Sequence, residues 1–228
     1  MIKSQVVSNA IRGKLTRQKN EEKPVEINCE NPIIRRDNSY YEVIGKDEIC
    51  IDDEIPFEIP NNWMWIRGKD CFEKQQSTIP SGDYFDYIDL DSIDNKNHIV
   101  KQPKRMASSA APSRARRHIK SGDVLFSVVR PYLENIALID FKTSHCIAST
   151  GFYICRPKKF INSHYLYNLM LSPYVVNTLN SFMKGDNSPS IRGDNITNLL
   201  YPIPPIEEQM RINEKLAEVL QFTNQLSD

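Results

Sequence analysis

The amino-acid sequence predicts an α/β fold of the α+β type, with a twisted, mostly antiparallel sheet, a short N-terminal helix and a long C-terminal helix. Three observations support this class. Short runs of β-branched and aromatic residues alternate with turn residues between positions 84 and 155. Apolar residues at helical spacing occupy 161–184, and a seam with a heptad repeat follows Ile206. A chain of 228 residues is long enough for one sizeable core.

The N-terminal part is predicted to contain one helix and a long polar connection. Residues 2–15 carry apolar side chains at helical spacing. Residues 17–55 are polar and charged, and they predict a connection across a surface, with one irregular hairpin around 40–51. The segment 54–65 holds two prolines, which favour an extended chain, and its two tryptophans are expected to anchor it by burial.

The central part is predicted to be mainly strands. Four segments have strand character: 84–90, 124–129, 136–140 and 147–155, the last of them interrupted by Gly151. Residues 95–120 are charged and show little strand pattern, so they predict an exposed loop with a short basic turn.

Helices and turns dominate the remaining sequence before the last helix. Residues 161–184 predict a helix that Ser163 caps and that Pro173 kinks or splits. Residues 185–198 have the composition of turns throughout, and 199–203 predict a short strand.

The last helix begins at Pro205-Ile206 and carries one apolar seam. The seam consists of Ile212, Leu216, Val219, Thr223 and Leu226. Such a seam needs a partner, for which the N-terminal helix, a second copy and a segment outside this sequence are candidates. Packing against the chain's own domain is the alternative.

Charge is segregated along this chain, although its net charge is zero. From Lys101 to Arg130 there are eight Lys or Arg residues and one acid, which gives a local balance of +7. Seven acids lie in 42–58 and five in 83–94. A basic face of this kind suits the phosphate backbone of a nucleic acid, and an acidic face elsewhere discourages incorrect docking.

Two loops have the composition expected for contacts with DNA, namely 101–120 and 184–198. The residues proposed for phosphate contacts are Arg105, Arg114, Arg116, Arg117 and Arg130. Those proposed for base contacts are Lys104, Ser108, Asn187, Ser188, Ser190 and Arg192. Lys101 and Lys184 complete the set of DNA-binding candidates.

The sequence offers no constellation that predicts catalysis or a metal site. It has no glycine-rich phosphate loop, and its four histidines do not have metal-ligand spacing. The five cysteines include no C-x-x-C pair and predict reduced thiols. The absence of a bilayer-spanning apolar run and of a secretory signal predicts a cytoplasmic protein without membrane contact. An unrecognised nuclease or methyltransferase, and a protein-interaction module that uses the helix seam, are the alternatives.

Several strings resemble one family when they are taken together and in order. They are AIRGKLTRQ (10–18), EIPFEIPNNWMWIRG (54–68), YIDLDSID (87–94), APSRARRHIKSGDVLFSVVRPYLENIA (111–137), ASTGFYICRP (148–157) and LLYPIPPIEEQMRINEKLAEVL (199–220). The sequence thereby resembles the specificity subunit of Type I restriction-modification systems.

The resemblance implies a role and a set of partners. Such a subunit has two target-recognition domains, each followed by a long helix, and the two helices pair antiparallel so that each domain reads half of a bipartite DNA sequence. It binds two methyltransferase subunits, which carry S-adenosylmethionine and methylate adenine, and motor-nuclease subunits join them. The chemistry therefore lies in other subunits, and no cofactor is expected in this chain.

This chain is similar to one half of such a subunit. The implied division is an N-terminal helix segment at 1–16, a target-recognition domain at 17–204 and the start of the spacer helix at 205–228. The chain is then either a fragment or a half-subunit, and two copies of a half-subunit would read a palindromic bipartite site.

Overall fold

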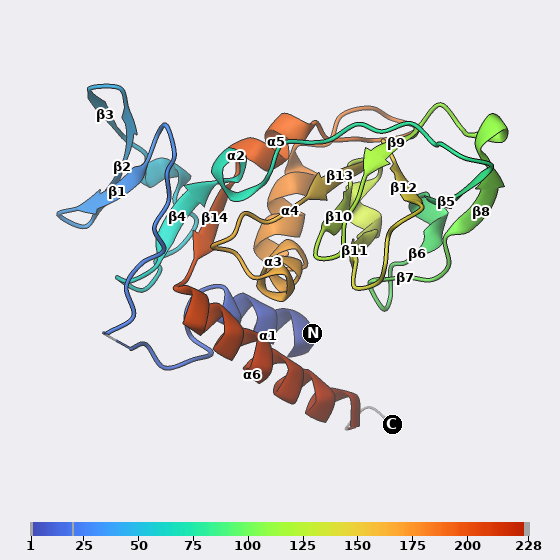
Figure 1. Ribbon diagram of the computed structural model, residues 1–228. Coiled ribbons are helices and arrows are strands. Elements are labelled where there is room, and N and C mark those ends of the chain that lie inside the picture. Colours follow the sequence, from blue (N-terminus) through green and yellow to red (C-terminus); the bar gives the residue numbers. More distant parts are fainter. Residues whose placement is uncertain (1, 20, 226–228) are drawn as a thin grey trace.

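The computed structural model describes residues 2–19 and 21–225. Figure 1 shows a central group of helices with β-strands packed on one side, and a small three-stranded sheet on the other side. Helices α1 (Ile2–Ala10) and α6 (Ile206–Gln225) lie together below this body. The strand pairs are antiparallel except for one, so the predicted class of a mostly antiparallel α+β fold is confirmed.

A three-stranded sheet lies between two cores. Its order is β11 (Ile136–Leu138), β10 (Val124–Ser127), β13 (Phe152–Cys155). One face, with Phe126 and Tyr153, joins the main core that the helices form. The other face, with Leu125 and Ile154, joins a second core. Side chains alternate between the faces of a strand, so both cores follow from the near-continuous apolar runs of the sequence.

The second core is shared with a four-stranded sheet. Its order is β8 (Lys104–Ala107), β5 (Tyr84–Ile88), β12 (Cys146–Ser149), β9 (Ala115–His118), and β5 pairs parallel with β12. Ile88 and Ala148 point toward the three-stranded sheet, while Tyr87 and Ile147 form a small cluster on the outer face.

The prediction of an exposed loop at 95–120 is wrong. This segment contains β8, β9 and one strand of a small hairpin formed by β6 (Ile93–Asp94) and β7 (Ile99–Val100). Strand β9 is paired on both sides, because the backbone of residues 76–78 lies along the edge opposite β12. These partners are distant in sequence, so the charged composition of the segment conceals the strands.

The predicted strand at 147–155 is two strands in different sheets, β12 and β13, joined by a turn at 150–151. The predicted strands at 84–90, 124–129, 136–140 and 199–203 correspond to β5, β10, β11 and β14 (Leu200–Ile203). Strand β14 pairs with β4 (Met64–Arg67), which leads into the short helix α2 (Gly68–Cys71).

The predicted helix at 161–184 is split at Pro173 into α3 (Ser163–Met170) and α4 (Pro173–Ser181). The side chain of Asn162, rather than that of Ser163, caps α3, and Ser172 caps α4. The predicted turn region 185–198 ends in a short helix, α5 (Gly193–Asn198).

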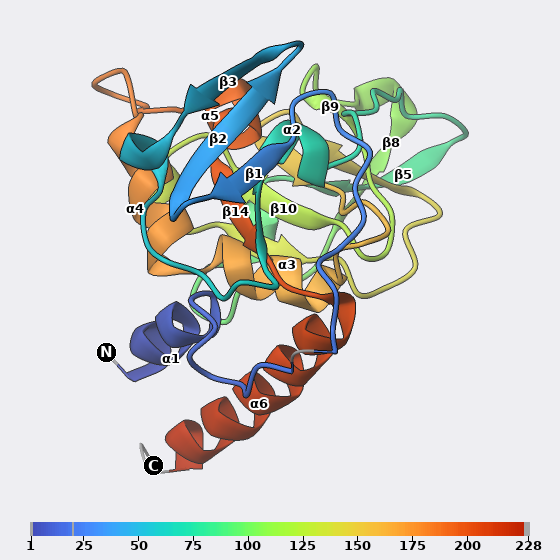
Figure 2. The same ribbon diagram turned by 90° about the vertical axis from the view of Figure 1, so that its left-hand side faces the viewer.

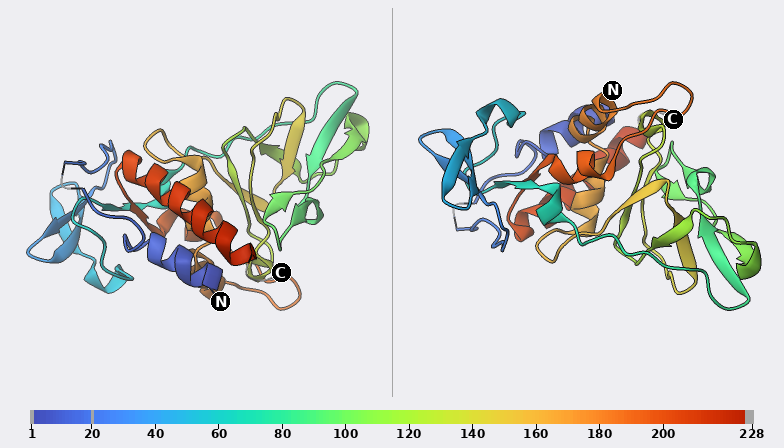
Figure 3. Two further views of the ribbon diagram at one scale, coloured as in Figure 1. Left: turned by 90° about the horizontal axis from the view of Figure 1, so that it is seen from below. Right: turned by 90° about the horizontal axis from the view of Figure 1, so that it is seen from above.

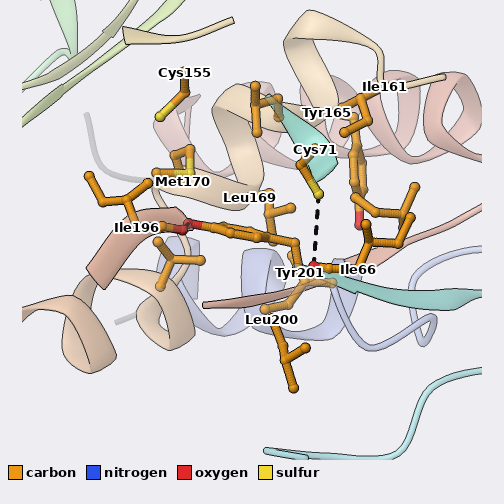
Figure 4. Close-up of a cluster of buried hydrophobic side chains, with 14 of the residues drawn as sticks. Ile66, Cys71, Cys155, Ile161, Tyr165, Leu169, Met170, Ile196, Leu200 and Tyr201 are labelled. Carbon is orange, nitrogen blue, oxygen red and sulfur yellow. Dashed lines mark hydrogen bonds between the residues drawn. The ribbon is translucent and has the colours of Figure 1, made fainter. Parts of the chain in front are cut away.

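Buried tyrosines hold the helices against β14. Figure 4 shows Tyr165 and Tyr201 among aliphatic and sulfur-containing side chains of the main core. Their hydroxyl groups donate to the carbonyl oxygens of Pro202 (2.7 Å) and Ile196 (3.1 Å). Each polar tip is therefore satisfied inside the core.

The N-terminal sheet has one strand more than predicted. It comprises β1 (Ile33–Arg36), β2 (Ser39–Ile44) and β3 (Asp47–Cys50), and the β2–β3 pair is the predicted hairpin. Arg67 connects this sheet to the body, because its guanidinium group donates to Glu42 and Glu54, each at 2.7 Å. The anchoring of the extended segment by burial of Trp63 and Trp65 is confirmed.

Helix α6 is fixed at its start by two buried polar residues, Glu208 and Gln209. The Glu208 carboxylate accepts hydrogen bonds from Thr16 (2.8 Å), Gln18 (2.7 Å) and the indole of Trp63 (2.8 Å). The Gln209 amide donates to the carbonyl oxygens of Phe160 and Pro204 and accepts from the backbone N–H of Asn162. The Pro-Pro-x-x-Glu-Gln string thus fixes the direction in which α6 leaves the body.

The first part of the helix seam is covered by the chain itself. Ile212 and Leu216 are buried in the main core, and α6 packs on α1 and α3. Figure 2 and the left view of Figure 3 show α1 running antiparallel along α6. Val219 is half-buried; the side chain of Thr223 and the whole of Leu226 lie outside the described residues. In this part of the chain, the N-terminal helix and the chain's own domain cover these two positions of the seam.

Candidate nucleic-acid interface

A series of backbone hydrogen bonds brings the two predicted DNA-contacting loops together. The N–H of Thr150 donates to the carbonyl of Arg114, and the N–H of Val128 donates to that of Gly151, each at 2.9 Å. The N–H of Ile191 then donates to Val128 (2.9 Å). The loop before β9 and the loop before α5 are therefore connected across the ends of β10, β12 and β13.

We call this feature the arginine edge, defined by Arg114, Arg116, Arg117, Arg130, Lys184 and Arg192. Within the described residues, none of these six cations forms an ion pair with a carboxylate. Arg114, Arg130, Lys184 and Arg192 are exposed, whereas Arg116 and Arg117 are half-buried in β9. Unpaired, accessible cations of this kind are suited to phosphate groups.

Arg116 and Arg117 differ from the sequence prediction because they lie on a strand and not on a flexible turn. The Nη1 atom of Arg116 donates to the carbonyl of Ala115 (2.8 Å), and the Nε atom of Arg117 is buried without a partner among the described residues. Arg117 also lies near Tyr153: burial raises the pKa of that phenol to about 12, and the charge of Arg117 acts in the opposite direction.

Arg130 connects the arginine edge to the loop at 184–190. Its backbone N–H donates to the carbonyl of Pro189 (2.7 Å), and its Nη2 donates to that of Asn187 (3.2 Å). Lys184 and Ser190 exchange two backbone hydrogen bonds, each at 3.0 Å, which close the loop that carries Asn187 and Ser188. Both of these tip residues are exposed.

The remaining predicted residues form a separate group on and near β8. Lys104 is paired with Asp89 at 2.7 Å, which raises the pKa of its ammonium group through that hydrogen bond. Arg105 lies 3.9 Å from Asp86 and over the ring of Tyr84. Lys101 is exposed, and Ser108 is half-buried beside Ser81. The structure places this group at the other edge of the four-stranded sheet from β9, so it does not join the arginine edge.

The sequence reasoning missed the segment 73–78, which borders β9. The amide of Gln75 pairs with both backbone groups of Ile154, donating to its carbonyl (2.6 Å) and accepting from its N–H (3.1 Å). Lys74 and Ser77 are exposed, and Ser77 pairs with Arg117. The polar run KQQST between two apolar segments was the available signal.

An ion pair under β9 holds this segment in place. Asp123, which is buried, accepts from Arg156 at 2.7 and 2.8 Å, and Arg156 also donates to Gln76 (3.2 Å). The hydrogen bonds to Asp123 raise the pKa of Arg156. Burial, followed by the charges of Arg156 and Lys120, lowers the pKa of His118 below its ordinary value.

The described residues hold neither a metal-binding cluster nor a membrane-spanning helix. Residues 2–19 and 21–225 contain no group of three or more His, Cys, Asp or Glu side chains that could hold a metal ion. In the same part of the chain, every helix is too short or too polar to cross a membrane.

Packed sheets that carry accessible cations without carboxylate partners among the described residues, together with a long helix, fit the class of nucleic-acid-recognition domains. Residues 60–228 match the family model of the Type I restriction modification DNA specificity domain. The chain therefore belongs to that family.

Individual relatives agree with this assignment. The chain is 24% identical to the Type I restriction enzyme EcoAI specificity subunit of Escherichia coli over 97% of its own length and 39% of the relative. It is 24% identical to the EcoDI specificity subunit of Escherichia coli, covering 75% of this chain and 37% of the relative. The MjaVIII specificity subunit of Methanocaldococcus jannaschii is 23% identical over 71% of this chain and 40% of the relative.

Solved structures give the same result. The crystal structure of the HsdS subunit from Thermoanaerobacter tengcongensis matches with a TM-score of 0.69 and 35% identity, over 76% of this chain and 46% of that one. A chain from a structure of a Type I R-M system assembly matches with a TM-score of 0.67 and 34% identity. This chain thus spans less than half the length of the relatives that it matches.

Proposed function

We propose that this chain recognises a specific duplex DNA sequence as the specificity subunit, or as half of the specificity subunit, of a Type I restriction-modification complex. The family match over residues 60–228 is the observation that carries the proposal. The arginine edge supports it, because its six cations have no carboxylate partners in the described structure and four of them are exposed and accessible to phosphates.

The proposed partners follow from the relatives. Methyltransferase subunits would bring S-adenosylmethionine and methylate adenine, and motor-nuclease subunits would cut unmodified DNA. Within this chain we assign residues 17–204 to target recognition, 1–16 to the N-terminal helix segment and 205–228 to the start of the spacer. We place the complex in the cytoplasm, where its DNA lies.

The proposed contacts divide by environment. The five cations of the arginine edge other than Arg192 are assigned to phosphates. Arg192, Asn187, Ser188 and Ser190 are assigned to base edges; the first three are exposed, and Ser190 is half-buried where the loop closes. Lys101, Lys104, Arg105 and Ser108 are proposed as peripheral contacts, since Lys104 and Arg105 face carboxylates of their own sheet. The alternative of a protein-interaction module loses support because Ile212 and Leu216 are already covered within the chain.

A methylome tests the proposal. The chain would be expressed with the methyltransferase subunit from its own source in a host that lacks adenine methylation, and modified adenines would be read by long-read sequencing. A new bipartite motif is expected, and a palindromic motif would indicate a pair of half-subunits. Association of the two proteins without methylation would indicate that a second recognition domain is needed. No association and no methylation would refute the proposal.

A further inference from the structure

An exposed apolar pair stands beside the arginine edge. Tyr132 is 47% exposed and Leu133 is 40% exposed, although both follow a buried proline, Pro131. They form the short 3-10 turn η4 (Pro131–Leu133) between β10 and β11. Two adjacent large apolar side chains that are both exposed offer a small apolar surface to a ligand.

The turn that carries the pair is rigid. Arg130 and Glu134, which flank it, both have left-handed backbone conformations, with φ values of +47° and +52°. Side chains other than glycine rarely adopt this conformation, and it persists where surrounding contacts impose it. Here the amide of Asn95 donates to the carbonyl of Leu133 (2.8 Å), and the turn packs against α4.

The position of the pair connects it to the proposed DNA contacts. Arg130, the residue that begins the turn, is exposed and forms no ion pair within the described residues. Its backbone and guanidinium group both bind the loop of Asn187 and Pro189. The apolar pair is thus joined rigidly to a cation and to polar side chains that can reach a duplex.

We propose that Tyr132 and Leu133 form a wedge that enters a groove of the target duplex and partly unstacks one base step. This proposal rests on the proposed function. Apolar side chains that insert between base steps kink DNA. Arg130, the cation that begins the turn, is placed to hold a displaced phosphate. An aromatic ring beside an aliphatic side chain offers both a surface for stacking and a bulk that separates bases.

The wedge would add to specificity without hydrogen bonds to bases. Pyrimidine–purine steps unstack more readily than others, so a wedge favours sites that have such a step at the contacted position. The expected consequence is that part of the sequence preference depends on these two side chains, whereas non-specific affinity depends on the arginine edge.

The test uses the full chain in complex with its methyltransferase subunits. Duplexes with the motif found by the methylome, and scrambled controls, would carry 2-aminopurine at successive positions, because its fluorescence rises when it unstacks. The wild-type complex is expected to raise the signal at one step that is separate from the methylated adenines, because a methyltransferase that flips its target adenine gives a signal of its own there. The variant Tyr132→Ala/Leu133→Ala is expected to lose that signal and to bind the motif about tenfold or more weakly.

Other readouts separate the wedge from a phosphate contact or a structural role. The double variant should keep the wild-type non-specific affinity and salt dependence, and Tyr132→Phe should retain both the signal and the affinity. A mismatch at the responding step should strengthen wild-type binding more than binding by the double variant. Ile49→Ala is the matched control, since Ile49 is an exposed apolar side chain (50%) on β3 of the N-terminal sheet. If the double variant folds poorly, Tyr132→Ser alone replaces it.

The outcomes are distinguishable. If the double variant binds and unstacks the motif as the wild type does, the wedge is refuted while the proposed function stands. If the variant instead loses its methyltransferase subunits, the pair is a protein contact and the wedge is likewise refuted. If the wild-type complex does not distinguish the motif from scrambled DNA, the proposed function itself fails.

Discussion

The carboxylate of Glu208 connects three segments of the chain, and we expect its removal to be costly. The Glu208→Ala variant leaves donors on Thr16, Gln18 and Trp63 without their acceptor, the last of them in the core. Unsatisfied buried donors cost about 1–3 kcal/mol each, so the free energy of unfolding should fall by about 3 kcal/mol or more. Urea denaturation measures this change.

The adjacent Glu207 provides the matched control. It has the same charge in the same helical turn, but it is exposed. Glu207→Ala should change the free energy of unfolding by no more than about 0.5 kcal/mol. If both substitutions lowered the free energy of unfolding equally, the charge at the helix terminus, and not the three hydrogen bonds, would explain how Glu208 stabilises the fold.

Arg114 permits a test of the arginine edge that folding does not confound, because its side chain is exposed. Arg114→Ala should weaken binding to motif and scrambled duplexes alike and reduce the slope of log K against log salt by about 0.9, the value for one phosphate contact. Lys46→Ala, which removes an exposed cation from the N-terminal hairpin, should leave the slope unchanged. An unchanged slope for Arg114→Ala would exclude this phosphate contact.

Single residues of the candidate site could be predicted from charge, but their surroundings could not. The density of arginines between positions 114 and 130 identified cations that the structure leaves unpaired. The sequence could not reveal that Lys104 faces Asp89, since the two lie on different strands. The pairing of Gln75 with the backbone of Ile154 was equally hidden, because it joins positions 79 apart.

Among the structural elements, the segment before β1 is joined to α6 by one ion pair. Arg211 donates to both carboxylate oxygens of Glu22, one of them at 2.7 Å, and these bonds lower the pKa of Glu22 below its ordinary value of 4.5. The Glu22 carboxyl group therefore binds its proton less tightly in the folded chain than in the unfolded chain. The resulting stability is present above about pH 4.5 and is lost as the pH falls through the lower folded value.

The Arg211→Met variant should remove this pH dependence. We expect the difference in unfolding free energy between wild type and variant to shrink as the pH falls from about 6 to about 3.5, since other carboxylates titrate equally in both proteins. Lys215→Met, which breaks an exposed pair with Glu218, should show a much smaller difference at every pH. A pH-independent difference for Arg211→Met would contradict the assignment.

Elements with local signals were predicted better than those that depend on distant partners. Pro173 divides two helices as its missing N–H requires, and the apolar run at 124–129 is a strand in the core. The run at 147–155 looked like one strand, but its two halves pair in different sheets. Strand β9 was missed because its arginines are polar and its partners are far away in sequence.

At the scale of the whole molecule, helices α1 and α6 lie together below the body. Helix α6 is covered by the chain at Ile212 and Leu216, whereas Phe222 near its end is 59% exposed. The same helix therefore serves the domain at its start and leaves apolar surface for a partner further along. Phe222 lies beside the seam and not in it, so the two roles fall on different faces of the helix.

Two substitutions in α6 should separate these roles. Leu216→Ala removes a buried side chain and should lower the free energy of unfolding by about 2–5 kcal/mol. Phe222→Asp should leave the free energy of unfolding within about 0.5 kcal/mol of wild type, because Phe222 is exposed. The same substitution should weaken co-purification with the methyltransferase subunit, because a charge replaces an exposed apolar contact. Gln221→Asp, at the exposed neighbouring position, adds the same charge and should retain the partner. Loss of stability without loss of partner binding in Phe222→Asp would mean that the end of α6 serves the fold and not the assembly.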